Sequence, residues 1–244
     1  MDKQRIKRLP PRFDNQMSKT QIVLGWIYAA MHIVVLPRLL DLYVTFSPNE
    51  VTSSRYNLLW YGVGIVFVLC VMLGWLRQNF DVLLDNFRGC VFCIMLGFAI
   101  QYAMSLPVAL LLSLTGSAAV ENPNNANIME MAEGNYGLIK ALAIFVAPIV
   151  EEVLFRGVIF GSIRPRSRGW AYVVSIGLFA AYHVMSYVLE SGDLRQLIYI
   201  IQYIPAAAAL AWVYEHSGCI WATIFYHMGF NALSFAVLNV LGRM

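Results

Sequence analysis

Seven long apolar runs constrain the fold of this chain more than any other feature. A helix that crosses the ~30 Å apolar core of a bilayer needs about 20 mostly apolar residues. The runs that reach this length cover roughly residues 21–46, 58–76, 90–114, 138–160, 170–190, 197–216 and 219–240. Charged residues make up only 13% of the chain, whereas soluble domains carry about a quarter. We therefore predict an all-α, polytopic integral membrane bundle of about seven transmembrane helices.

The boundaries of this bundle leave some alternatives open. An eighth helix in segment 77–89 or 115–137 is compatible with the sequence. Pro107 lies inside the third run and predicts a kink or a break there, because proline lacks a backbone N–H. Ser217 and Gly218 separate the last two runs and predict a tight turn.

The distribution of Lys and Arg indicates how the helices are oriented. Eleven of them lie before the first run, after the second or after the fourth, and only three lie in the other connections or at the C-terminus. Basic residues favour the cytoplasmic side. We therefore expect a cytoplasmic N-terminus. The 115–137 loop carries three Glu and no base, so we expect it to face outward.

Two adjacent glutamates and an arginine interrupt the fourth run, "APIVEEVLFRGVIF". Ionisable residues inside a membrane are costly and therefore suggest function. Glu152 and Arg156 are four residues apart, so on a helix they share a face and pair. Glu151 is rotated by about 100° from Glu152 and has no basic residue three or four positions away. A carboxylate without such a partner suits a general base.

Three more polar residues lie in the last helices at compatible depths. His183 belongs to the fifth run, and His227 and Asn231 are four apart in the seventh. At 1.5 Å per residue, the depths of the glutamates and the two histidines agree within roughly 8 Å. We expect these groups to converge. Each histidine alone could equally form an interhelical hydrogen bond. His32 has no obvious partner in the sequence, and we expect it to pack.

Three short motifs at these residues resemble those of a known family. "EEVLFR", "FAAYH" and "HMGFN" are similar to the E-E-x-x-x-R, F-x-x-x-H and H-x-x-x-N motifs of the CPBP (Abi) intramembrane proteases, the group that includes the type II CAAX prenyl endopeptidases. The motifs occur in the expected order on separate helices. The resemblance covers the expected catalytic helical core (138–240). The basic cytoplasmic tail (1–20) and the N-terminal transmembrane helices (21–137) add no motif, and we expect all three parts to form one integral membrane domain.

The resemblance implies an intramembrane endopeptidase and a role for each motif residue. Glu151 would be the base that activates water, and His183 would help to hold that water. His227 and Asn231 would stabilise the oxyanion, and Glu152 with Arg156 would support the site. No H-E-x-x-H is present, and a water-activating glutamate needs no ion, which favours a mechanism without metal. Zinc held by Glu151, His183 and His227 stays open.

The substrate is less constrained by the sequence. The resemblance implies a membrane-anchored peptide or protein, and it does not decide whether prenylation is required. Bacterial members of the family are associated with bacteriocin self-immunity and peptide-signal processing, so we expect a bacterial cytoplasmic membrane and no nucleic-acid partner. The alternatives are a non-catalytic immunity or peptide-binding membrane protein, and a proton-coupled carrier. The carrier is disfavoured because no inverted repeat is visible.

Overall fold

The computed structural model describes residues 13–114 and 135–240, and all regular secondary structure in these two ranges is helical. Five of the described helices are long and apolar enough to span a membrane. These observations confirm the all-α polytopic membrane bundle. The first part of the basic tail, residues 1–12, and most of the acidic loop, residues 115–134, lie outside the described residues.

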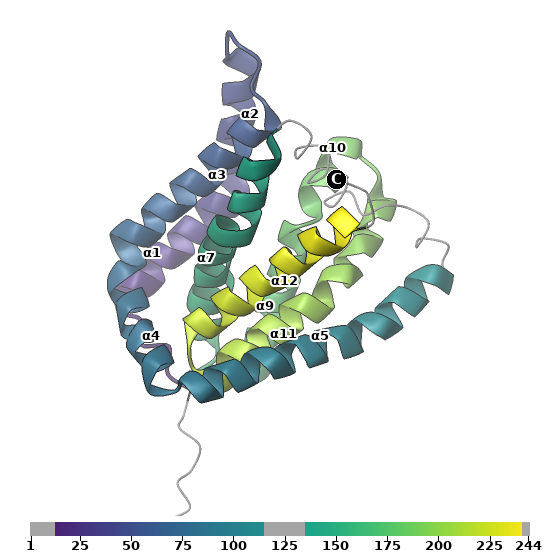
Figure 1. Ribbon diagram of the computed structural model, residues 1–244. Coiled ribbons are helices and arrows are strands. Elements are labelled where there is room, and N and C mark those ends of the chain that lie inside the picture. The colour runs from purple at the N-terminus through teal and green to yellow at the C-terminus, as the bar shows by residue number, and fades with distance from the viewer. Residues whose placement is uncertain (1–12, 115–134, 241–244) are drawn as a thin grey trace, which may run out of the picture.

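The N-terminal half forms two long helical hairpin arms and one oblique helix (Figure 1). Short π-helical segments interrupt both arms. The elements are α1 (Lys19–Ala30), η1 (Met31–Val35), α2 (Leu36–Phe46), α3 (Ser53–Phe67), η2 (Val68–Met72), α4 (Leu73–Asp85) and α5 (Phe87–Leu114).

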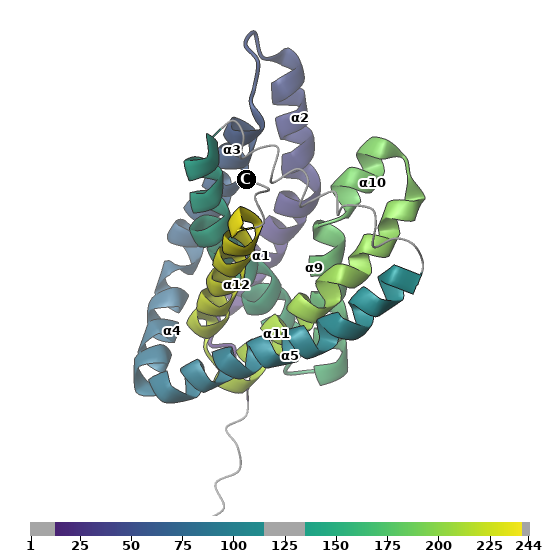
Figure 2. The ribbon, with the colours of Figure 1, turned by 45° about the vertical axis from the view of Figure 1, so that its right-hand side comes forward.

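The C-terminal half begins with helical residues 135–141 and continues without a break to residue 163. Its elements are η4 (Leu142–Val146), α7 (Ala147–Glu152), η5 (Val153–Phe160), α8 (Gly161–Ile163), α9 (Arg168–Tyr182), α10 (Met185–Ser191), η6 (Leu194–Tyr199), α11 (Ile200–Ser217) and α12 (Ile220–Val240). Both η4 and η5 are π-helical. Figure 2 shows α2 and α10 at one end of the bundle and the α4–α5 junction at the other.

Local sequence signals explain several helix ends. Ser18 and Gln21 form a reciprocal capping box at the start of α1, which satisfies two backbone donors. Thr52 and Ser167 are the N-caps of α3 and α9. Both have an extended backbone, and the side chain of each accepts a hydrogen bond from a backbone N–H in the first turn. Gly218 has a φ of 64°, a left-handed conformation that glycine adopts without strain. It ends α11 and confirms the predicted tight turn.

Two helix boundaries differ from the sequence-based prediction, and of the kink or break predicted at Pro107 the break does not occur. The second helix continues to Asp85, so most of segment 77–89 extends that helix and forms no separate one. Helix α5 runs through Pro107 without a break. The fifth predicted run ends as a helix at Tyr182, where the chain turns before α10 begins. His183 therefore caps α9, and its position is not that of a mid-helix residue.

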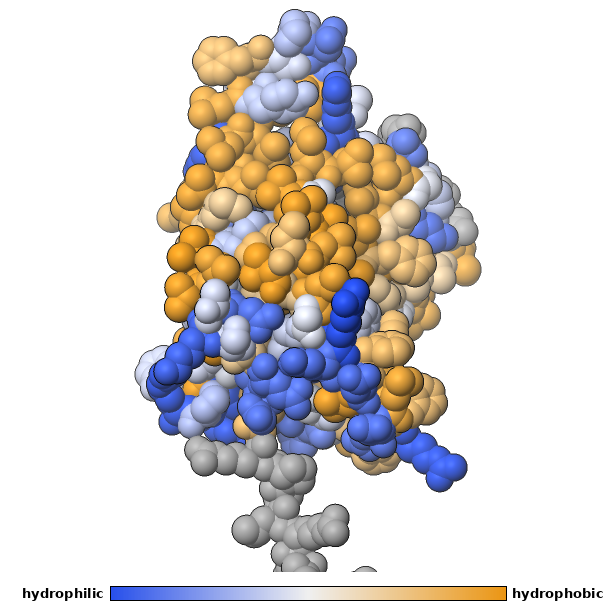
Figure 3. Space-filling view, turned by 90° about the vertical axis from the view of Figure 1, so that its left-hand side faces the viewer, coloured by the Kyte–Doolittle hydropathy of each residue, from blue (hydrophilic) through white to orange (hydrophobic). Residues whose placement is uncertain are grey.

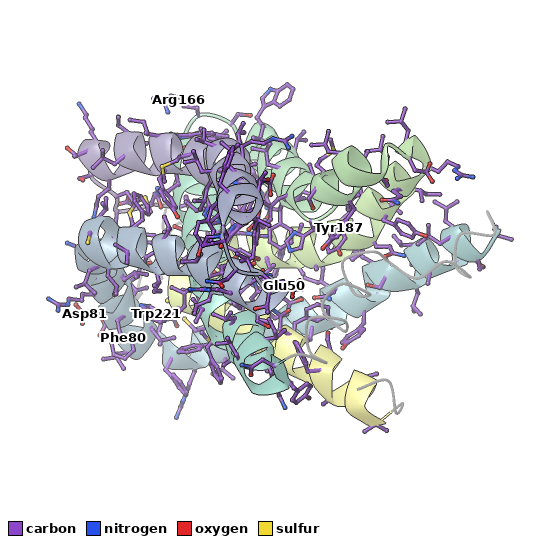
Figure 4. The ribbon with its side chains drawn as sticks, turned by 90° about the horizontal axis from the view of Figure 1, so that it is seen from above. Glu50, Phe80, Asp81, Arg166, Tyr187 and Trp221 are labelled. Atoms are coloured by element: carbon purple, nitrogen blue, oxygen red, sulfur yellow. The ribbon has the colours of Figure 1, made fainter. Side chains whose placement is uncertain are left out.

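The outer surface suits a lipid environment. Large apolar side chains such as Phe92, Met95 and Leu106 are exposed on α5. In Figure 3, hydrophobic residues cover the middle of the visible face, and hydrophilic residues gather toward its lower end. Phe80, Asp81 and Trp221 lie together at one edge of the bundle (Figure 4), where they help to line an apolar surface groove between α4 and α12.

The helix that carries the two glutamates lies at the centre of the bundle. Every residue of η5 is buried, and η5 packs against α1, α9, α11 and α12 while α7 packs against α3 and α12. Glycine permits two of these close approaches. A Cβ on Gly25 would lie 2.5 Å from Val158, and one on Gly64 would lie 2.7 Å from Val150. Small residues of this kind let membrane helices approach closely.

Candidate active site

Glu151, Glu152 and Arg156 are buried in the interior of the bundle. Glu151 is 3% exposed, and Glu152 and Arg156 are 0% exposed. Glu151 and Glu152 end α7, and Arg156 lies one turn further on in η5. Two carboxylates and one guanidinium share a region in which unpaired charge is costly. Their partners therefore decide what each of them can do.

Arg156 and His227 hold Glu152. Arg156 Nη1 donates to Glu152 Oε1 at 3.0 Å, and His227 Nδ1 lies 2.9 Å from the same oxygen. Arg156 Nη2 donates to the carbonyl of Ala207, and the guanidinium lies over the Phe179 ring at 4.3 Å. A hydrogen-bonded pair of this kind offsets much of the cost of burying its two charges. The predicted pairing of Glu152 with Arg156 is confirmed.

Glu151 has a different set of neighbours. The Tyr61 hydroxyl donates to Glu151 Oε1 at 2.9 Å. Glu151 Oε2 lies 3.8 Å from His183 Nε2 and 3.9 Å from His227 Nε2. These two distances exceed a direct hydrogen bond. One carboxylate oxygen is therefore bound by tyrosine, and the other faces two imidazole nitrogens.

Each imidazole is oriented by a bond at its far nitrogen. His183 Nδ1 lies 2.9 Å from the carbonyl of Phe179. Because a carbonyl only accepts, Nδ1 carries the proton and Nε2 of the neutral ring is an acceptor. In His227, Nδ1 donates to the Glu152 carboxylate. Both Nε2 atoms consequently face Glu151, and the expected convergence of Glu151 with the two histidines is confirmed as geometry.

The Asn231 side chain on α12 is hydrogen-bonded to the backbone of η4. Its Nδ2 donates to the carbonyl of Ala143 at 2.8 Å. In the π-helical segment η4 the Ala147 N–H bonds to the carbonyl of Leu142, so the Ala143 carbonyl would pair with residue 148. That residue is Pro148, which has no N–H. The asparagine supplies the missing donor and retains a second N–H, since an amide nitrogen carries two hydrogens.

Sequence reasoning missed Tyr61 and the partners of His32. Tyr61 lies 90 residues from Glu151 and belongs to no motif. A tyrosine inside an apolar run is nevertheless a signal, because a buried hydroxyl usually finds a partner. His32 is buried and packed among aromatic rings as expected, but it does have partners: its Nε2 accepts from Trp60 Nε1 at 2.8 Å, and its Nδ1 lies 3.1 Å from the Tyr28 hydroxyl.

The side chains that could hold zinc are Glu151, His183 and His227. Across residues 13–114 and 135–240, no group of three or more His, Cys, Asp or Glu side chains has an arrangement suited to a metal ion.

The fold and this site define a polytopic helical membrane protein with a buried carboxylate–imidazole cluster. Residues 135–233 match a family model described as type II CAAX prenyl endopeptidase Rce1-like. This match supports membership of the chain in the CPBP (Abi) family, as the three motifs predicted, and it suggests an intramembrane endopeptidase. Helices α1 to α5 lie outside the matched segment. No curated protein and no solved structure gave a significant match.

Proposed function

We propose that this protein is an intramembrane endopeptidase in which Glu151 activates water to hydrolyse a peptide bond of a membrane-anchored substrate. One observation carries the proposal. Glu151 Oε2 lies 3.8 and 3.9 Å from the Nε2 atoms of His183 and His227, while Arg156 neutralises the neighbouring Glu152. Glu151 Oε2 is thus bound neither by Tyr61 nor by Arg156, and it lies in the buried interior beside the imidazole rings of His183 and His227.

The first step is activation of water. A water bound at this point donates one hydrogen to Glu151 Oε2 and the other to His183 Nε2, which accepts because its Nδ1 proton is held by Phe179. Both hydrogens are then engaged, and an oxygen lone pair is left for the substrate carbonyl. Glu151 takes a proton as the hydroxide oxygen adds to the carbonyl carbon. General bases of this kind contribute about 10²–10⁴-fold to rate.

The second step is stabilisation and collapse of the tetrahedral intermediate. His227 donates from Nε2 to the oxyanion when its ring carries both protons, and Glu152 stabilises that imidazolium through Nδ1. The second N–H of Asn231 is the other proposed donor. Such donors act strongly where water is excluded. The intermediate collapses as the C–N bond breaks, and Glu151 returns its proton to the leaving amine.

The proposed setting follows the charge pattern and the family. The substrate is a peptide or protein anchored in the bilayer, and the proposed location is a bacterial cytoplasmic membrane with the N-terminus in the cytoplasm.

Arg164 and Arg168, which belong to the basic side of the bundle, bind Glu215. This cluster provides a control carboxylate that touches none of the site residues.

The experiment is cleavage in liposomes by the wild type, Glu151→Gln and Glu215→Gln. The substrate is a pool of membrane-anchored peptides that includes a prenylated CAAX peptide, with and without a zinc chelator. We expect the wild type and Glu215→Gln to cleave and Glu151→Gln to lose cleavage by at least about 10²-fold. Loss of cleavage with chelator, restored by added zinc, would assign the metal.

Equal cleavage by the wild type and Glu151→Gln would exclude Glu151 as the base. If the folded wild type cleaves nothing while binding a membrane peptide, the alternative of a non-catalytic immunity or peptide-binding protein is favoured. An immunity assay of Glu151→Gln in cells then separates these two, because a binding protein keeps its phenotype in this nearly isosteric variant.

A further inference from the structure

The N-terminal helices contribute one polar side chain that contacts Glu151 directly. Tyr61 lies on α3, outside the segment that matches the family, and its hydroxyl is 2.9 Å from Glu151 Oε1. The contact depends on close packing of α3 against α7. Gly64 lies one turn from Tyr61 and directly faces the Val150 side chain, with no room for a Cβ. The close approach of the two backbones at Gly64 thus brings the Tyr61 hydroxyl, one turn away, within hydrogen-bonding distance of Glu151.

A second tyrosine, Tyr182, lies beside Tyr61 and immediately precedes His183. Its hydroxyl lies 3.4 Å from His32 Nε2. A tyrosine hydroxyl has a single hydrogen, and an ionised carboxylate only accepts. The hydrogen of Tyr61 therefore goes to Glu151, which fixes the direction of this bond.

A buried histidine supports the same group of aromatic side chains from α1 and η1. The indole of Trp60 is a donor only, so His32 Nε2, which accepts from it at 2.8 Å, carries no hydrogen in the neutral ring. His32 Nδ1 then donates to the Tyr28 hydroxyl. The His32 ring also stacks on that of Tyr182, with centroids 6.1 Å apart. His32 therefore holds Tyr182, the tyrosine that lies beside Tyr61.

We propose that Tyr61 is a positioning residue for the glutamate base. By holding Oε1, its hydroxyl fixes the rotation of the Glu151 carboxylate and turns Oε2 toward His183 and His227. Preorganisation of this kind matters because a reacting group must be held close to its productive geometry. The effect on rate rests on the proposed function, whereas the hydrogen bond to Glu151 is tested without any substrate.

The experiment compares Tyr61→Phe with Tyr214→Phe. Tyr214 is a matched control because it is buried and its hydroxyl donates to Asn15 at 2.8 Å, away from Glu151. Infrared spectra of protein carrying ¹³C-labelled glutamate are recorded for each background with and without Glu151→Gln, and their difference isolates the Glu151 carboxylate band. Thermal unfolding of each variant is measured alongside, and both are expected to lose about one hydrogen bond of stability.

We expect the Glu151 band to shift in Tyr61→Phe and to stay in place in Tyr214→Phe. On the liposome substrate, kcat of Tyr61→Phe should fall by about ten- to a hundredfold, the factor of one hydrogen bond to a charged group, with KM unchanged. An unmoved band overturns the positioning contact, whether or not the protein is active. A shifted band with an unchanged kcat overturns the positioning role. If the wild type cleaves nothing, the proposed function fails, and the band alone decides whether Tyr61 holds the carboxylate.

Discussion

His227 Nδ1 lies 2.9 Å from Glu152 Oε1, the same oxygen that Arg156 Nη1 contacts at 3.0 Å. One oxygen thus joins a permanent cation to an imidazole whose other nitrogen faces Glu151. Glu152 has two tasks in this arrangement. It neutralises the buried arginine, and it fixes the tautomer and the orientation of His227.

The first prediction separates these two tasks with Glu152→Gln. Glutamine keeps the shape of the side chain but cannot stabilise a doubly protonated His227. In serine proteases, the comparable Asp→Asn change lowers kcat by about 10⁴-fold because the histidine tautomer is wrong. We expect a loss of kcat of about 10²–10⁴-fold in Glu152→Gln and little change in KM. Steady-state kinetics in liposomes measures both. A kcat within a fewfold of the wild type would show that His227 does not act through Glu152.

The second prediction concerns the buried ion pair itself. Arg156→Met leaves Glu152 charged, buried and without its cation, which typically costs about 3–5 kcal/mol. The double variant Glu152→Gln/Arg156→Met removes both charges and should recover most of that loss. Thermal or denaturant unfolding in detergent micelles checks the cycle. If the single and double variants are equally unstable, the arginine stabilises the bundle through its contacts with Phe179 and Ala207 rather than through charge.

The members of the carboxylate–imidazole cluster could be predicted because their residue types stand out in the sequence itself. Charges are rare in apolar runs, and helical spacing alone pairs Glu152 with Arg156. Tyr61 could not be assigned in this way, since its contact depends on which faces of α3 and α7 meet. That choice is made by Gly64 and Val150, two apolar residues with no pattern of their own.

The end of α9 was missed for a related reason. The run 170–190 stays apolar past Tyr182, so hydropathy continues where the helix does not. The turn is marked by a side chain that bonds to the backbone: His183 Nδ1 meets the carbonyl of Phe179. A histidine at the end of a helix can bind the last carbonyls in this way. The sequence thus placed His183 inside a helix, whereas the structure places it at the end of α9.

The third prediction tests the close packing that brings Tyr61 to Glu151. In Gly64→Ala the new methyl would lie 2.7 Å and 2.9 Å from the two methyl groups of Val150. A β-branched residue in a helix has one strongly preferred rotamer, so Val150 cannot turn away and the helices must separate. We expect a loss of about 1–3 kcal/mol in stability together with the shift of the Glu151 infrared band expected for Tyr61→Phe.

The matched control for this prediction is Gly64→Ala/Val150→Ala. The second substitution removes the two methyl groups that the new Cβ would meet, so the band of Glu151 should return to its wild-type position. Stability need not return fully, because the shortened side chain leaves a void. A band that stays shifted in the double variant would argue that α3 is placed by contacts other than the Gly64–Val150 approach.

The fourth prediction concerns the bond between Asn231 and the backbone of η4. Asn231→Ala leaves the partly buried Ala143 carbonyl without its donor, which should cost up to about 1–3 kcal/mol, the range for an unsatisfied buried group. Pro148→Ala in that background introduces an N–H at the position that a π-helical bond from Ala143 requires. The double variant should therefore regain stability in unfolding experiments. Pro148→Ala alone is the control for the effect of the proline.

Activity distinguishes this structural role from the proposed role of Asn231 at the oxyanion. If Asn231 only supports the backbone, Asn231→Ala/Pro148→Ala regains activity along with stability. If its second N–H also binds the oxyanion, the double variant regains stability while kcat stays low, by about 10²–10³-fold for one lost donor. We expect the second outcome, because Asn231 lies one turn from His227 on α12 and the stabilisation of an oxyanion requires a donor beside the imidazole.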